Sequence, residues 1–208
     1  MRVAGTIRIP GDKSITHRAL LLAALARGRS HIGGALTSLD ARSTARVLRR
    51  LGAEVSPLRE GSVVVVQSRG RFSRPAKVLD CGNSGTTTRL LLGLLSGHRF
   101  STTLTGDASL RRRPMRRVTL PLSRMGATFA ELAGDGLPLT VRGGALTALT
   151  YEMPVSSAQL KSAILLAGLA GGVEVALREP HGRSRDHTER LLRAFGYQVD
   201  EADGWIRL

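Results

Sequence analysis

Three short polar strings stand directly before the most apolar runs of this chain. The strings are Lys13-Ser14-Ile15-Thr16, residues 83–88 (Asn-Ser-Gly-Thr-Thr-Thr) and Ser156-Ser157-Ala158-Gln159. Where an apolar run folds as a helix, the string before it lies at the helix N-terminus, whose unpaired N–H groups and partial positive charge attract anions. Serine, threonine and asparagine also cap helices without binding a ligand, so one string alone indicates no more than a cap.

Cations accompany all three strings. Lys13 and Arg18 fall in the first turns of the first apolar run. Arg89 follows the second string, and Lys161 follows the third. A cation near a helix start opposes the helix dipole, and an anion held between the cations resolves that conflict. Gly85 lets a ligand approach the backbone closely. These residues predict an anion site where three helix starts meet.

A loop at residues 105–114 carries three consecutive arginines, 111–113, before Pro114. Proline is favoured in the first turn of a helix, so we expect a helix to start there. Arg113 or one of its neighbours has the forked geometry to hold a carboxylate or phosphate. We expect at least one of the three arginines to be an ordinary solvated side chain.

A second loop, residues 182–189, has the sequence Gly-Arg-Ser-Arg-Asp-His-Thr-Glu. Asp186 is expected to cap the helix that follows, with Glu189 completing a capping box. Arg185 is then free to face the anion site. We expect His187 in the first turn at the surface, and not as a metal ligand.

The chain repeats one order of features three times. The serines that open the repeats and the glycines that close them recur about every 70 residues. They are Ser14, Ser84 and Ser157, and Gly52, Gly126 and Gly196. Each closing glycine follows a helix, as a C′ glycine does. We therefore predict an α/β (α+β) fold of three βαβαββ repeats, at about 11–75, 76–148 and 149–208. The first helix of each repeat is apolar all round and should be buried, whereas the second is amphipathic.

Composition narrows the function classes. The net charge is +15 and nearly all of it is arginine, which suits anionic small molecules, an acidic partner or nucleic acid. Aromatic residues are only 3% of the chain, so few side chains are available to stack on nucleic-acid bases. Cys81 is the one cysteine, which rules out an internal disulfide and favours the cytoplasm. The longest apolar run, 163–173, is too short for a membrane span. We find no nucleotide-binding glycine motif and no zinc-ligand spacing, and expect no metal or organic cofactor.

Five strings resemble the 5-enolpyruvylshikimate-3-phosphate synthase (3-phosphoshikimate 1-carboxyvinyltransferase) family. They occur in order at residues 10–19, 82–86, 113–114, 157–162 and 184–189. The related enzymes that act on UDP-N-acetylglucosamine share the fold but differ at Lys13-Ser14. The resemblance implies a transferase that moves the enolpyruvyl group of phosphoenolpyruvate to the 5-hydroxyl of shikimate 3-phosphate, in chorismate and aromatic amino acid biosynthesis.

The resemblance also implies roles for single residues. Those for shikimate 3-phosphate are Lys13, Ser14, Arg18, Ser157, Gln159 and Arg185, and those for phosphoenolpyruvate are Lys13, Gly85, Arg113 and Gln159. Lys13 alone is expected to be catalytic. Gly85 matches the glycine of glyphosate-sensitive members, so the complete enzyme is expected to be inhibited by glyphosate.

The family has two domains of three repeats each, and this chain holds three repeats. The resemblance makes residues 1–10 a strand of the other domain and residues 11–208 the shikimate-3-phosphate-binding domain. We expect the chain to need that C-terminal domain for turnover, to be inactive alone and to be a monomer when complete, without nucleic-acid or membrane partners. The chain is then a separate domain, a natural fragment or half of a split enzyme. The alternative is a non-catalytic module that binds anions or nucleic acid.

Overall fold

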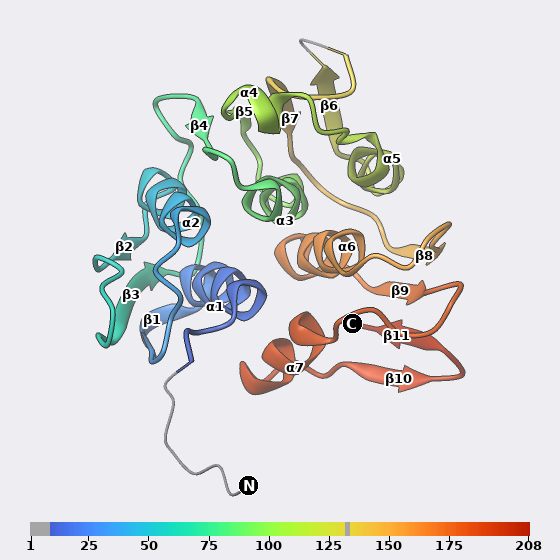
Figure 1. The fold of residues 1–208 in the computed structure, drawn as a ribbon. Helices are drawn as coiled ribbons and strands as arrows, with labels where there is room; N and C mark the ends of the chain where they lie inside the picture. The colour runs from blue at the N-terminus through green and yellow to red at the C-terminus, as the bar shows by residue number, and fades with distance from the viewer. Residues whose placement is uncertain (1–8, 132–133) are drawn as a thin grey trace, which may run out of the picture.

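In the part of the chain that the structure describes, three small sheets surround three central helices, which Figure 1 shows nearly end-on. The computed structural model describes residues 9–131 and 134–208, so the strand expected at residues 1–10 lies almost wholly outside the described part. The predicted α/β fold class, with repeats packed around buried helices, is confirmed.

Two kinds of longer helix alternate along the described chain, as their sequences predict, and the short helix α4 (Ala108–Arg111) lies between two of them. The inner ones are α1 (Lys13–Leu25), α3 (Gly85–Ser96) and α6 (Ala158–Gly171); the outer ones are α2 (Leu39–Arg50), α5 (Arg116–Arg124) and α7 (His187–Ala194). The inner helices bury nearly every residue after their first turns, because leucine and alanine occur on all their sides. The outer helices bury one face and expose arginines on the other. Among the described helices, none is both long enough and apolar enough to cross a membrane.

The sheets repeat a common plan. Their strand orders are β1 (Arg27–Ile32)–β3 (Val64–Arg69)–β2 (Glu54–Val55); β4 (Leu79–Asp80)–β5 (Ser101–Thr105)–β7 (Leu139–Arg142)–β6 (Thr128–Glu131); and β10 (Asp200–Ala202)–β11 (Trp205–Arg207)–β9 (Val175–Arg178)–β8 (Leu149–Glu152). The pairs β4–β5 and β8–β9 are parallel, and the crossovers between them are the inner helices α3 and α6. The second and third units therefore show the predicted βαβαββ order.

The three closing glycines have the predicted conformation. Gly52, Gly126 and Gly196 have φ angles of +98°, +106° and +86°, each just after an outer helix. Glycine adopts positive φ without the steric penalty of a Cβ, which ends the helix and turns the chain into the next strand.

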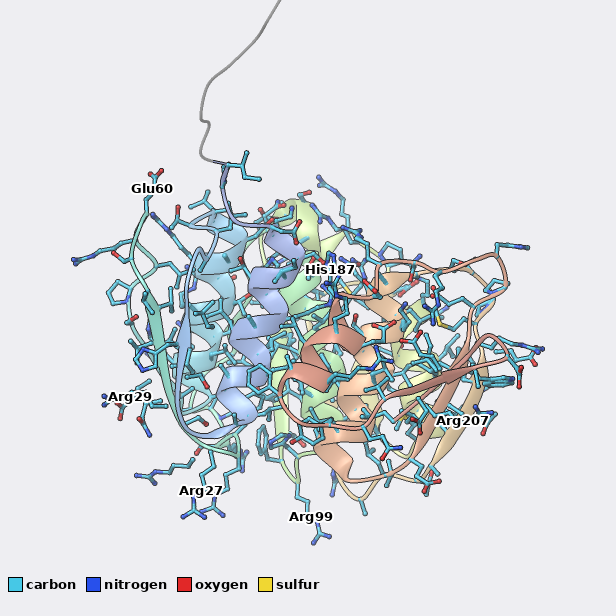
Figure 2. The ribbon with its side chains drawn as sticks, turned by 90° about the horizontal axis from the view of Figure 1, so that it is seen from below. Arg27, Arg29, Glu60, Arg99, His187 and Arg207 are labelled. Atoms are coloured by element: carbon cyan, nitrogen blue, oxygen red, sulfur yellow. The ribbon has the colours of Figure 1, made fainter. Side chains whose placement is uncertain are left out.

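The inner helices start at the same end of the molecule. Figure 2 shows Arg27 and Arg99, which follow the ends of α1 and α3, at one end, and His187 nearer the other. Helices α3 and α6 pack closely, since a Cβ on Gly93 would overlap the carbonyl oxygen of Ala163. The N-termini of the inner helices consequently form one rim, as the sequence predicted.

Candidate functional site

Each inner helix begins with a capped N-terminus. The cap of α3 is Ser84 and that of α6 is Ser157, whose hydroxyls accept from the N–H groups of Thr87 and Leu160. The cap of α1 is Asp12, whose Oδ1 accepts from the Ile15 N–H at 2.7 Å. Ser14, the expected start of this helix, is its second residue. Its side chain is thereby free for another partner.

Arg18 joins the starts of α1 and α6 to α7. Its Nη1 donates to the carbonyl and the hydroxyl of Ser14, at 3.0 and 2.6 Å. Its Nη2 donates to Ser162 Oγ at 2.6 Å and to the Ala158 carbonyl at 3.3 Å. Its Nε donates to Thr188 Oγ1 at 2.6 Å. One guanidinium thus fixes the distance between two helix starts.

The Arg18 guanidinium is a fixed, buried charge. The residue is 2% exposed, and all five of its N–H donors point to neutral oxygens. Burial lowers its pKa to about 10; Glu189 opposes the lowering and Arg185 adds to it. Arg18 is therefore charged at neutral pH. A ligand bonds to it directly only by replacing one of its present acceptors.

A chain of hydrogen bonds joins the start of α1 to the start of α3. His17 Nδ1 lies 2.6 Å from Thr44 Oγ1, which lies 2.7 Å from Thr87 Oγ1. Thr87 Oγ1 in turn donates to Ser84 Oγ at 2.7 Å. Burial lowers the pKa of His17 to about 4, so the imidazole is neutral near pH 7. Sequence reasoning missed Thr44, because a polar residue on the buried face of an amphipathic helix carries no signal of its partners.

Two guanidiniums converge on Gly85 at the start of α3. A Cβ placed on Gly85 would lie 2.9 Å from Arg89 Nη1 and 3.2 Å from Arg113 Nη1. Arg113 Nη2 donates to Asn83 Oδ1 at 3.0 Å, which holds it beside the helix start. Of the three consecutive arginines, Arg113 is thus the one at the predicted site. Arg111 instead donates to the Gly106 carbonyl.

Gln159 links this second cluster to α6. Its amide nitrogen donates to Thr86 Oγ1 at 2.9 Å, and its Oε1 accepts from Arg89 Nη1 at 3.1 Å. Burial lowers the pKa of Arg89, and the charges of Arg117 and Arg113 lower it further. Arg89 Nε is buried and has no hydrogen-bond partner within the described ranges. Positive charge accumulates here, which favours an anion.

Lys13 lies at the rim in an ion pair. Its Nζ is 3.1 Å from Asp40 Oδ2, at the start of α2, and its side chain is 55% exposed. The sequence placed Lys13 correctly at the helix start but did not predict this partner. The bond is exposed and exchangeable, as surface ion pairs are.

Lys161 is not at the rim, contrary to our expectation. It is fully buried, and its Nζ lies 3.0 Å from Glu179 and 2.7 Å from Glu189. Its counter-anions are protein carboxylates, which resolve the conflict with the helix dipole. The predicted capping box at Asp186 and Glu189 is wrong for the same reason: Glu189 turns inward to Lys161, and the Asp186 side chain makes no cap hydrogen bond.

Arg185 is exposed beside the Arg18 cluster, where its charge acts on the Arg18 pKa. Its neighbour Arg183 pairs with Glu201. Thr188 was missed by sequence reasoning, although its bond to Arg18 links α7 to the site.

The described surface also has hollows of about 600 Å³ beside α2 and about 530 Å³ beside β9, away from the rim. Charge and hydrogen bonding, not hollow size, identify the site.

The predicted residues therefore form two neighbouring clusters. Ser14, Arg18 and Arg185 gather near the start of α6, next to its cap Ser157. Gly85, Arg113 and Gln159 gather near the start of α3, and Lys13 lies on the α2 side of the rim.

Comparison with known proteins identifies relatives of this chain. The sequence profile of the family described as EPSP synthase (3-phosphoshikimate 1-carboxyvinyltransferase) matches residues 1–207. Relatives named 3-phosphoshikimate 1-carboxyvinyltransferase from Geotalea uraniireducens and Geobacillus kaustophilus are 49% and 52% identical, over 99% and 94% of this chain and 48% and 46% of their own lengths.

Solved structures give the same result. EPSP synthase from Acinetobacter baumannii superposes with a TM-score of 0.93 at 42% identity, over 98% of this chain and 46% of that one. The enolpyruvyl transferase NikO from Streptomyces tendae shares the fold, with a TM-score of 0.74 at 16% identity over 99% of this chain and 48% of that one. The chain thus spans about half the length of the relatives it matches. From the family match, the sequence identities and the superposition together, this chain belongs to the EPSP synthase family.

Proposed function

We propose that this chain supplies the shikimate-3-phosphate half of an active site that transfers the enolpyruvyl group of phosphoenolpyruvate to shikimate 3-phosphate. The observation that carries the proposal is the joining of three inner helix starts at one rim by Arg18, Gln159 and the His17–Thr44–Thr87 chain. Helix N-termini and fixed guanidiniums attract anions, and both substrates are anions.

The cluster around Arg18 suits shikimate 3-phosphate. Ser14 and Ser157 offer hydroxyls, and Arg185 is an exposed guanidinium that can fork onto a phosphate. Arg18 contributes a fixed positive potential and, by exchanging an acceptor, a direct bond. Gln159 lies between the two clusters and serves both substrates.

The cluster around Gly85 suits phosphoenolpyruvate. Arg113 faces the helix start across Gly85, whose lack of a side chain leaves room for a small carboxylate or phosphate. Lys13 approaches from the α2 side. When it releases Asp40, its ammonium group is free to hold phosphoenolpyruvate and to donate a proton.

The reaction needs charge stabilisation more than covalent help from the protein. The methylene carbon of phosphoenolpyruvate gains a proton, and the neighbouring carbon bonds to the 5-hydroxyl oxygen of shikimate 3-phosphate, which gives up its own proton to a base. The resulting tetrahedral intermediate then loses a proton from the methyl carbon and expels phosphate. Preorganised cations and helix dipoles stabilise the charge that develops in these steps. Lys13 is the catalytic residue of this half, as cation and proton donor.

The remaining acid–base groups belong to a second domain in this proposal. The complete enzyme is a cytoplasmic monomer whose second domain closes on the rim, positions the reactants and excludes water. This chain alone binds shikimate 3-phosphate weakly and does not turn over. A charge-assisted hydrogen bond contributes about 1.5–3 kcal/mol. After the loss of freedom on association, two or three such bonds correspond to a roughly micromolar to millimolar Kd.

Calorimetric titration of the chain with shikimate 3-phosphate tests this function. Arg185→Ala should weaken binding tenfold or more, because its guanidinium lies open beside the cluster. Arg183→Ala is the matched control: it removes an equal charge two residues away, from a side chain that pairs with Glu201, and should leave binding unchanged. No heat up to several millimolar ligand, or equal losses in both variants, contradicts the assignment. Product formed by the purified chain contradicts its inactivity.

A further inference from the structure

Lys161 lies at the centre of a buried ionic cluster that the proposed function does not use. Its Nζ contacts Glu179 Oε2 and Glu189 Oε1, at 3.0 and 2.7 Å, and donates to the Ser184 carbonyl at 3.3 Å. The side chains of Lys161, Glu179 and Glu189 are 0%, 4% and 1% exposed. The cluster joins α6 to α7 and to the irregular segment between β9 and α7.

Stability alone gives little reason for this cluster. Buried ion pairs are often no more stabilising than apolar side chains of similar volume, because both charges lose their hydration. Lys161 is also the fourth residue of α6, where a cation opposes the helix dipole. The described structure leaves Glu179 Oε1 and Glu189 Oε2 buried without partners, so the cluster is not a fully satisfied network.

The cluster has a specific mechanical consequence for the segment 179–186, which has no helix or strand of its own. Ser184 is held from both sides, because its carbonyl accepts from Lys161 and its N–H donates to Glu179 Oε2 at 3.1 Å. Arg185 is the next residue. The path of its backbone is therefore fixed relative to α6, the helix that also begins with Ser157 and Gln159.

We propose that Lys161 is a positioning residue that acts through Arg185, an inference that rests on the proposed function of this rim. By holding Glu179 and Ser184, it keeps the Arg185 guanidinium at the start of α6 before the ligand arrives. Binding is tighter when a loop does not have to be ordered on association. Without Lys161, two carboxylates remain buried with no cation between them. The segment that carries Glu179 then moves and α7 stays in place, because the bond from Arg18 to Thr188 also holds α7.

Affinity for shikimate 3-phosphate tests the proposal, measured on the whole chain by calorimetry. Lys161→Met should weaken binding tenfold or more, and Lys161→Arg should recover most of the loss, because it keeps a cation between the carboxylates. Glu179→Gln is the variant that should fold normally, because Lys161 keeps its ion pair with Glu189. Only the ion pair that links Lys161 to the loop is lost. This variant should weaken binding severalfold. Lys77→Met removes an exposed lysine elsewhere and should change nothing.

A double-mutant cycle separates positioning from general stability. In an Arg185→Ala background, Lys161→Met should cause no further loss of affinity, because the residue through which it acts is already gone. Losses that add in the double variant overturn the proposal. So does wild-type affinity in both Lys161→Met and Glu179→Gln when Arg185→Ala binds weakly.

Amide hydrogen exchange gives a readout that needs no ligand. The Ser184 amide should exchange at least tenfold faster in Glu179→Gln and in Lys161→Met, while amides in the middle of α6 keep their protection. Unchanged exchange at Ser184 overturns the positioning role whatever the ligand result. If the wild-type chain binds no shikimate 3-phosphate but Ser184 responds as expected, the loop link stands and the proposed function fails.

Discussion

The Arg89 guanidinium and the Gln159 amide meet between α3 and α6, with Nη1 donating to Oε1 at 3.1 Å. This neutral acceptor leaves Arg89 without a carboxylate bonded to it, next to Arg113 and Arg117, whose charges act on its pKa more strongly than the opposing charge of Asp135. The Gln159 amide nitrogen is committed to Thr86, which sets the side-chain orientation that the bond requires. A neutral glutamine thus holds the arginine without neutralising it, and the cluster stays attractive to anions.

Gln159→Glu should therefore have opposite effects on stability and binding. The carboxylate forms a charge-assisted bond with a largely buried arginine, which should stabilise the fold by about 1 kcal/mol. The same charge cancels Arg89 at the site and repels phosphoenolpyruvate, so affinity in the complete enzyme should fall at least tenfold. Urea unfolding and steady-state KM measure the two effects.

Gln67→Glu is the matched control for this substitution. Gln67 also accepts from an arginine, Arg29 Nε at 3.3 Å, but at an exposed position on β3. It should change neither binding nor stability measurably, because exposed ion pairs contribute little. A Gln159→Glu enzyme with unaltered KM for phosphoenolpyruvate would contradict the role of Gln159 in this cluster.

The sequence predicts the backbone of this domain well, for physical reasons. Apolar residues on all sides of 19–25 can only belong to a helix with neighbours on all sides, and the structure has it as α1. Glycine after an amphipathic run predicts a positive φ, and Gly52 has one. These are local properties, and the signal for each lies within a few residues.

The partners of the polar residues could not be predicted, because they are distant in sequence. Arg18 bonds to Thr188, 170 residues away, and nothing near Arg18 indicates that acceptor. Lys161 follows a helix start just as Arg89 does, yet its side chain points into the core because it pairs there with the carboxylates of Glu179 and Glu189. Proximity to a helix cap therefore indicates a cation near the helix start, but not whether that cation faces the rim or pairs with a carboxylate of the protein.

Arg18→Lys should destabilise the fold although it keeps the charge. Lysine has three donors at one atom and cannot reach all five acceptors from α1, α6 and α7, so buried oxygens lose their partners. We expect a loss of about 2–4 kcal/mol in the free energy of unfolding, measured with urea. Arg42→Lys, on an exposed position of α2, should have no measurable effect. Equal stability of the two variants would show that Arg18 does not bind the helices together.

His17 should make the fold sensitive to acid in a defined pH range. Its pKa falls from an ordinary 6.5 to about 4, chiefly through burial, with Lys13 and Arg18 adding to the effect and Asp40 opposing it. The unfolded chain therefore takes up the proton first. The contribution of neutral His17 is complete above pH 6.5, declines as the pH falls, and is exhausted near pH 4.

The measurement compares urea unfolding at pH 7.5 and pH 4.5. Wild type should lose about 2–3 kcal/mol more than His17→Gln between these values, following the linkage between proton uptake and unfolding. His98, whose pKa burial also lowers, contributes to both proteins and cancels in the comparison. His31→Gln, at an exposed position, should behave as wild type. A pH dependence that is the same in His17→Gln and wild type would rule out His17 as the acid-sensitive group.

Gly85→Ala should narrow the cluster around Gly85, where we propose that phosphoenolpyruvate binds, and reduce the inhibition of the complete enzyme by glyphosate. The new methyl group would lie 2.9 Å from Arg89 Nη1 and 3.2 Å from Arg113 Nη1, so the guanidiniums must move apart and the space between them is filled. The two guanidinium ends can shift at little cost, but the methyl group stays in the space proposed for the ligand. We expect it to weaken ligand binding by about 1–3 kcal/mol, which predicts a rise of about tenfold or more in both the KM for phosphoenolpyruvate and the glyphosate concentration for half-inhibition. Gly144→Ala, where the added carbon meets no atom within 4 Å, should leave both values unchanged. Wild-type turnover unimpaired in millimolar glyphosate would contradict the expected sensitivity, and a Gly85→Ala enzyme with wild-type KM would show that the ligand does not occupy this space.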